Sequence, residues 1–147
     1  MRYDTYLKVQ QLAKTFNTFN PFEIADMLGF KVVYRDIGTN LGFTQDFLGF
    51  THIVLNEKLK DIPYRWPVMA HELGHGVEHT ACAAWYTIGN LQKNSMEYQA
   101  NMFACYDLSK LYEEQFDMLP EDFKALQMAY ALPDEFYEFF TSSDIIN

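Results

Sequence analysis

The stretch "PVMAHELGHGVEHTACAAW", residues 67–85, decides how this chain is interpreted, because it contains the spacing His-Glu-x-x-His. Residues four apart lie on one face of an α-helix, with Cβ atoms about 5–6 Å apart. His71 and His75 can therefore hold one metal ion between their imidazole rings. Glu72 lies about 100° around the helix from His71. There it can take a proton from water without using a coordination position.

Two features of this stretch favour a catalytic type of metal site over a helix that carries two histidines by chance. All four histidines of the chain fall in one short window, at His52, His71, His75 and His79. Gly74 lies inside the expected helix, where glycine costs about 1 kcal/mol relative to alanine. We interpret Gly74 as a point where another backbone segment packs closely over the helix. A purely structural metal site is the second alternative.

A third ligand is expected downstream, because a catalytic zinc usually takes three protein ligands and leaves one position for water. The segment "NSMEYQANMFACYDL", residues 94–108, has Glu97 at the start of an expected helix and Asn101 one turn later. A carboxylate in the first turn is also favoured by the helix dipole, which is the structural alternative for Glu97. Asp107 and Cys105 are rival ligands, two or more turns further along. We therefore choose Glu97.

The composition predicts one packed domain over residues 1–147, since 49% of the residues are hydrophobic. The formal net charge of -9 argues against a nucleic-acid partner, which would require clustered Lys and Arg. Cys82 and Cys105 are too few for a disulfide framework and are interpreted as reduced thiols. The sequence shows neither a signal peptide nor an apolar run of the roughly 20 residues that a membrane span needs. We expect a soluble, cytoplasmic protein.

Hydrophobic periodicity predicts helices, then a small sheet, then helices again, which is an α+β layout. The expected elements are helices over 5–16 and 21–28, a strand over 31–36, one or two strands within 41–56, the motif helix from Pro67, and a helix over 96–110. The helix over 96–110 is expected to bury Met96, Ala100, Phe103, Ala104 and Leu108. After it, Pro120 and Pro133 separate two or three short helices.

Helix ends are predicted from capping residues. Asn20 is expected to cap the second helix, with Pro21 in its first turn. Residues 87–95 are interpreted as a loop, in which Asn94 or Ser95 caps the following helix.

The motif and its surroundings resemble the ImmA/IrrE family of metallo-endopeptidases. The resemblance rests on "AHELGH" (70–75), preceded by "IVLN" (53–56) and followed by "EYQANMFA" (97–104). It covers roughly residues 20–110, where we expect the core of the domain, with a helical tail over 111–147. The implied fold is a minimal zincin-like domain. A small mixed sheet packs against the HExxH helix and is followed by a helical C-terminal part.

The resemblance also implies roles for individual residues, in a site of the gluzincin type. His71, His75 and Glu97 would bind the metal, and Glu72 would be the general base. Asn101 would orient a ligating histidine by hydrogen bonding to it. Zinc is the expected metal, although the ligand set suits manganese as well.

The implied function is that of an intracellular zinc-dependent endopeptidase, often encoded on a phage or mobile element. Its substrate would be a helix-turn-helix transcriptional repressor, whose site-specific cleavage derepresses the genes of the element. One alternative is a non-catalytic, metal-containing binding module that sequesters a repressor or an antitoxin. The other is a zinc hydrolase that acts on a small molecule or an isolated peptide.

Two parts of the mechanism depend on residues around the motif. The strand "FTHIVLN", residues 50–56, is expected to form the sheet edge beside the cleft and to pair with an extended substrate. The residue that stabilises the oxyanion stays open. His79 is the first candidate, because it lies one helical turn beyond the motif, and His52, Tyr86 and Tyr98 are the alternatives.

Overall fold

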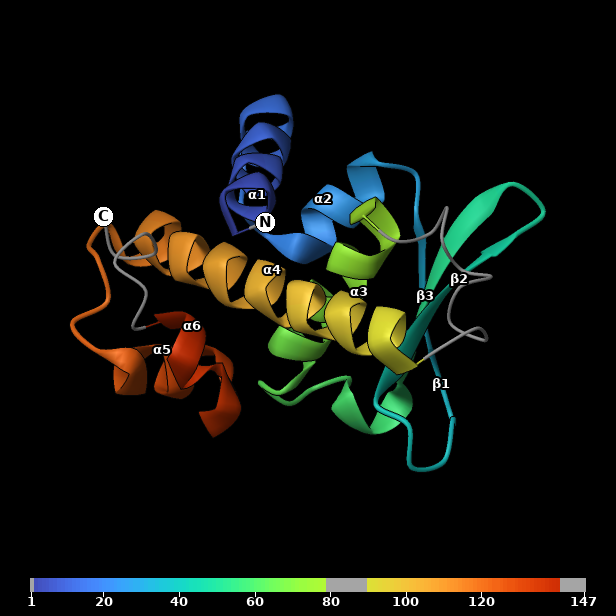
Figure 1. Ribbon diagram of the computed structural model, residues 1–147. Helices are drawn as coiled ribbons and strands as arrows, with labels where there is room; N and C mark the ends of the chain where they lie inside the picture. Colours follow the sequence, from blue (N-terminus) through green and yellow to red (C-terminus); the bar gives the residue numbers. More distant parts are fainter. Residues whose placement is uncertain (1, 79–89, 141–147) are drawn as a thin grey trace.

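The computed structural model describes residues 2–78 and 90–140 (Figure 1). The elements in chain order are α1 (Arg2–Phe16), α2 (Pro21–Met27), β1 (Lys31–Arg35), β2 (Gly42–Phe47), β3 (Phe50–Asn56), the 3-10 turn η1 (Glu57–Leu59), α3 (Arg65–Glu78), α4 (Asn90–Phe116), α5 (Phe123–Tyr130), the 3-10 turn η3 (Asp134–Phe136) and α6 (Tyr137–Phe140). A small sheet between helices confirms the predicted α+β class. The helices after α4 form the expected helical C-terminal part.

Within the described residues the sheet has three strands in the order β1-β3-β2, so β3 is its central strand. β3 pairs with β1 in parallel and with β2 antiparallel. The expectation that residues 50–56 form the sheet edge is therefore wrong. Ile53 and Leu55 are fully buried and Val54 is nearly so. Such a continuous buried run is typical of a strand with neighbours on both sides. The edge strand next to the motif helix is β2, which is in contact with α3.

α3 carries the His-Glu-x-x-His motif and contacts β2 and β3 as well as α4, which packs along it (Figure 1). The close approach predicted at Gly74 is present, but it is made by a side chain rather than by backbone. A Cβ added to Gly74 would lie 3.1 Å from Cγ of the fully buried Phe103 on α4. The two helices therefore pack so closely that a methyl group at this position would fit only if Phe103 gave way by a few tenths of an ångström.

α4 begins earlier and ends later than the helix predicted over 96–110. Residues 90–95 are helical, so Asn94 and Ser95 lie inside the helix and do not cap it. No Gly or Pro occurs between Asn90 and Leu119, and the polar residues at the start are therefore compatible with a helix. The five residues predicted to be buried are all buried, which confirms the orientation of the helix. Residues 87–89 lie outside the described part of the chain.

Other local predictions are confirmed. Oδ1 of Asn20 accepts hydrogen bonds from the backbone N–H groups of Phe22 and Glu23, at 2.9 and 3.3 Å. Pro120 lies between α4 and α5, and Pro133 lies between α5 and η3. Within residues 2–78 and 90–140, no helix is both long and apolar enough to cross a membrane.

The core contains a buried carboxyl group, that of Asp107. Asp107 on α4 is fully buried, and neither of its carboxyl oxygens has a hydrogen-bond partner among the described residues. Burial, and to a smaller extent the charge of Glu114, raises the pKa of Asp107 well above its usual value. The carboxyl group is therefore held in its neutral form over a wider pH range in the folded chain than in the unfolded chain.

We predict that Asp107 makes the protein less stable as the pH rises. The folded state keeps the proton that the unfolded state loses near pH 4, so the free energy of unfolding falls between that pH and the raised pKa. The slope from one such group is at most about 1.4 kcal/mol per pH unit. Asp107→Asn should remove it, and urea unfolding between about pH 5 and pH 8 measures the difference.

The exposed Asp26 gives a matched control, because Asp26→Asn makes the same chemical change at the surface. It should leave the pH dependence of stability as in the wild type. If Asp107→Asn and Asp26→Asn gave parallel stability curves across this pH range, the assignment of a raised pKa to Asp107 would be wrong.

Candidate metal centre

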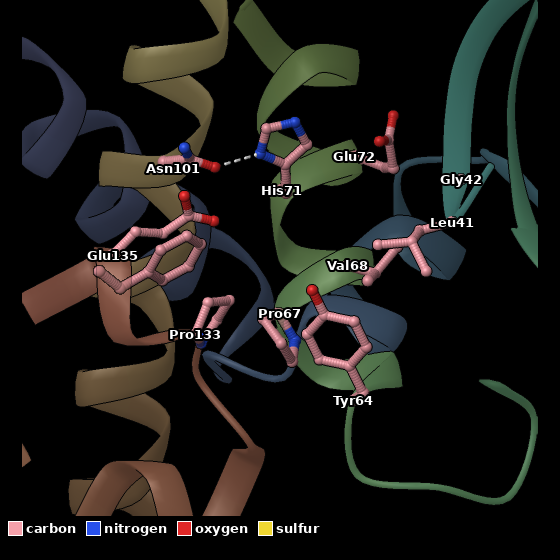
Figure 2. A pocket seen from close by; sticks show the side chains of 11 residues that line it. Leu41, Gly42, Tyr64, Pro67, Val68, His71, Glu72, Asn101, Pro133 and Glu135 are labelled. Carbon is pink, nitrogen blue, oxygen red and sulfur yellow. Dashed lines mark hydrogen bonds between the residues drawn. The ribbon is translucent and has the colours of Figure 1, made fainter. Parts of the chain in front are cut away.

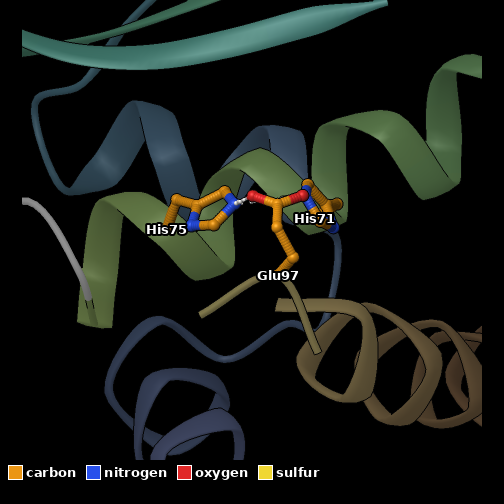
Figure 3. Close-up of side chains that lie close together, drawn as sticks. All are labelled: His71, His75 and Glu97. Atoms are coloured by element: carbon orange, nitrogen blue, oxygen red, sulfur yellow. Dashed lines mark hydrogen bonds and ion pairs between the residues drawn. The ribbon is translucent and has the colours of Figure 1, made fainter. Parts of the chain in front are cut away.

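Three side chains from two helices converge on one point (Figure 3). His71 and His75 project from α3, and Glu97 reaches between them from α4. One ligand atom from each residue lies within 4.8 Å of the others. Nε2 of His75 is 2.7 Å from Oε1 of Glu97, and Nε2 of His71 is 3.1 Å from Oε2. The two Nε2 atoms are 3.1 Å apart. The fold thus brings together the three residues that were expected to be ligands.

The donor set fits a first-row divalent metal ion. Two imidazole nitrogens and a carboxylate oxygen are ligands that zinc accepts, at bond lengths of about 2.0–2.2 Å. The separations between facing atoms, 2.7–3.1 Å, are less than twice that length, so one ion can contact all three residues. Within the described ranges, this is the single group of three His, Cys, Asp or Glu side chains with such spacing.

Asn101 lies one turn after Glu97 on α4 and orients His71. Its Oδ1 is 2.7 Å from Nδ1 of His71. A carbonyl oxygen can only accept, so we assign the proton of the ring to Nδ1, which donates to Asn101. Nε2 is then left with a lone pair that faces Glu97 and His75, as a metal ligand requires.

The electrostatics of the cluster favour positive charge at its centre. When Nε2 of these rings carries a proton, hydrogen bonds first from His71 and then from His75 hold the pKa of Glu97 well below its usual value, so this carboxyl group is ionised. Burial alone would lower the pKa of His71. The hydrogen bond to Glu97 and the charges of Glu72 and Glu97 outweigh burial, so the pKa of His71 is raised. A carboxylate that stabilises a proton on its neighbour also stabilises a metal cation at the same point.

Glu72 is buried beside the cluster but contributes no atom to it. The hydroxyl oxygen of Thr44 on β2 is 2.7 Å from Oε1 of Glu72 and 3.0 Å from its backbone carbonyl oxygen. This contact ties the expected general base to the edge strand of the sheet. Thr44 was not identified from the sequence. Its register opposite Ile53 places it on the sheet face that packs against α3, and the register was not known from the sequence alone.

The fold argues against Cys105 and Asp107 as ligands. It also argues against the helix dipole as the reason for a carboxylate at position 97. Cys105 and Asp107 are both fully buried and lie outside the cluster. α4 begins at Asn90, so Glu97 lies about two turns inside the helix. The dipole effect is confined to the first turn, and therefore does not account for a carboxylate at this position.

Two of the four candidates for oxyanion stabilisation, His52 and Tyr98, lie within the described residues, and both pack against aromatic rings. His52 faces the side of β3 opposite to Ile53, and its ring contacts Phe47 with 6.1 Å between ring centroids. Tyr98 packs against Phe139 with a centroid separation of 5.0 Å. Oxyanion stabilisation by His52 or Tyr98 stays a prediction, and the contacts found for both side chains are packing contacts. His79, Tyr86 and the thiol of Cys82 lie outside the described residues.

Comparison with known proteins agrees with this geometry. The family model described as the IrrE N-terminal-like domain matches residues 25–122, which include the whole cluster and Asn101. The chain belongs to the ImmA/IrrE family. It is similar to metallopeptidase ImmA of Bacillus subtilis (strain 168), with 32% identity over 101 residues. This alignment covers 66% of the chain and 58% of the relative, so the chain spans little more than half the length of ImmA. No solved structure gives a significant match.

We predict that the protein binds about one zinc ion per chain and that binding depends on the cluster. Glu97→Gln should lose most of the affinity, because a neutral amide replaces the carboxylate ligand. Asn101→Ala should weaken binding by roughly 10–100-fold, because His71 loses the partner that orients it. Competition titration against a zinc indicator measures both. Wild-type affinity in Glu97→Gln would exclude this residue as a ligand.

Proposed function

We propose that this chain is a cytoplasmic zinc-dependent endopeptidase of the gluzincin type. Its substrate is a helix-turn-helix repressor, and its cut derepresses phage or mobile-element genes. The observation that carries the proposal is the position of Glu72, a buried carboxylate held beside a three-ligand cluster without being part of it. A structural metal site has no need for such a group. Membership of the ImmA/IrrE family and the similarity to a named metallopeptidase support the activity.

The chain's own residues divide the chemistry between them. His71, His75 and Glu97 would hold the metal, which in such a site polarises a carbonyl group and makes a water molecule more acidic. Glu72 takes the proton from the attacking water and passes it to the leaving amine. The Thr44 hydroxyl keeps the Glu72 carboxylate turned toward β2, where a substrate would lie.

The edge strand β2 is the element best placed to hold an extended substrate. Among the described residues, β2 pairs with β3 along one edge, and its other edge has no strand partner. A cavity of about 460 Å³ lies between this strand and the cluster, with Thr44, Glu72 and Glu97 among its lining residues. A peptide that adds to β2 by main-chain hydrogen bonds would pass directly over the cluster. An open cleft of this kind favours a polypeptide over a small molecule.

The charge of the chain is compatible with the proposed partner. A net charge of -9 attracts basic proteins such as DNA-binding repressors, and it disfavours nucleic acid itself. Manganese is the alternative metal for the same ligands.

We predict that Glu72→Gln abolishes cleavage and keeps the metal. Wild type and variant are each co-expressed with the helix-turn-helix repressor encoded beside this gene, and the repressor's intact mass is read by mass spectrometry. A defined cut with wild type alone is expected, because the amide cannot accept the proton. The zinc content of the two proteins should be equal, since Glu72 is not a ligand.

The other outcomes separate the alternatives. If the repressor stayed intact and co-purified with both proteins, the chain would be a binding module and not an endopeptidase. Loss of zinc in Glu72→Gln would make Glu72 a ligand and contradict the proposed mechanism.

We further predict that Thr44→Val slows cleavage by roughly 10–100-fold without changing zinc affinity, because Glu72 loses the hydroxyl that positions it. Thr44→Ser keeps the hydroxyl and is the matched control, with near wild-type rates expected. The measurement is the rate of repressor cleavage at saturating zinc. A wild-type rate of cleavage by Thr44→Val would show that the Thr44 hydroxyl does not position Glu72 for the reaction.

A further inference from the structure

A second cavity adjoins the metal centre on the side of the N-terminal half of α3 (Figure 2). His71 and Glu72 form part of its wall, so whatever occupies it lies next to the reacting groups. Its volume is about 190 Å³. Pockets that bind whole small molecules usually measure about 300–1,000 Å³. The cavity is therefore suited to one large side chain of a substrate whose backbone lies in the cleft along β2.

The lining of this cavity is mainly apolar, and its polar groups are those of Tyr64, His71 and Asn101 together with two carboxylates. Leu41, Pro67, Val68 and Phe136 are among its apolar lining residues, and no Lys or Arg is among the described lining residues. The carboxylates are those of Glu72 and of Glu135, which enters from η3. Burial raises the pKa of Tyr64 on the opposite wall, and the charge of Glu135 raises it further. The field of the Glu135 carboxylate thus extends across the cavity.

The segment that carries Glu135 is anchored by contacts of the neighbouring Phe136. The adjacent Phe136 is buried, and its backbone carbonyl oxygen lies 3.8 Å from Sγ of Cys105 on α4. The Phe136 ring also packs edge-on against Phe139, with 6.1 Å between ring centroids. Glu135 itself is exposed to solvent, so its carboxylate is accessible to a ligand.

We propose that this cavity receives a substrate side chain next to the scissile bond and selects lysine or arginine through Glu135. The inference rests on the proposed endopeptidase function. The stem of such a side chain is apolar and matches the lining, while its charged end meets an acidic group. An acidic side chain would be repelled by Glu72 and Glu135. An apolar side chain would fit but would gain nothing from Glu135.

The test measures the affinity of two chelating probes for the zinc-loaded protein by calorimetry. N-acetyl-lysine hydroxamate and N-acetyl-norleucine hydroxamate share the metal-binding group and the side-chain stem, and they differ in the terminal ammonium. The wild type should bind the lysine probe about three- to fivefold more tightly, as an ion pair with an exposed carboxylate provides. Glu135→Gln should abolish the difference and leave the norleucine affinity unchanged. Glu135→Lys should disfavour the lysine probe.

Glu121→Gln is the matched control, because it removes one exposed acidic group that does not line the cavity. It should keep the wild-type preference. Equal affinities of the two probes for the wild type would overturn the inference and leave the metal centre intact. A lysine preference that survives Glu135→Gln would also overturn it. Failure to bind zinc, seen in the metal titration before any probe is added, would overturn the proposed function as well.

Discussion

The close packing of α3 on α4 at Gly74 and Phe103 is the constraint on which the candidate site depends. A Cβ at position 74 would lie 3.1 Å from the Phe103 ring and 3.2 Å from its Cβ, so alanine would require the Phe103 side chain to give way by a few tenths of an ångström. Glu97 is on α4, and any outward shift would carry its carboxylate away from the two histidines of α3. The cost of a glycine within a helix, about 1 kcal/mol, is offset by the approach that it permits.

The opposite side of α3 is constrained in the same way by the sheet. A Cβ at Gly42 on β2 would lie 3.1 Å from the backbone oxygen of Val54 and from Cγ1 of Val68 on α3. This close approach brings Thr44, two residues along the strand, within hydrogen-bond distance of Glu72. The two sides of α3 therefore have different chemistry. The side facing α4 carries the histidines of the cluster, and the side facing β2 carries the Glu72 carboxylate, which we propose as the general base.

The sequence predicted that His71, His75 and Glu97 lie together, and the structure brings them together. Helical spacing alone places His71 and His75 on one face, and Glu97 follows from the need for a third ligand. The central position of β3 depends on which strands pair with it, and no local pattern specifies that. Thr44 could be identified only with the register between β2 and β3, which the sequence does not specify. Glu135 lies after residue 122, where the match to the family ends. The early start of α4 was missed because the mostly polar sequence of residues 90–95 is compatible with a loop as well as with a helix.

One stripe of α4 connects the metal centre to the neighbouring cavity. Glu97, Asn101 and Cys105 are spaced by four residues and so follow one another along the same face of the helix. Glu97 joins the cluster, and Asn101 orients His71. Cys105 is about 12 Å further along than Glu97, too far to be a ligand. Burial raises the pKa of its thiol to about 12, so the thiol stays protonated and contacts the Phe136 carbonyl, next to Glu135. A shift of α4 along its axis would therefore move Glu97 and the cavity wall together. The position of Glu97 in the cluster and the shape of the neighbouring cavity thus depend on the same helix.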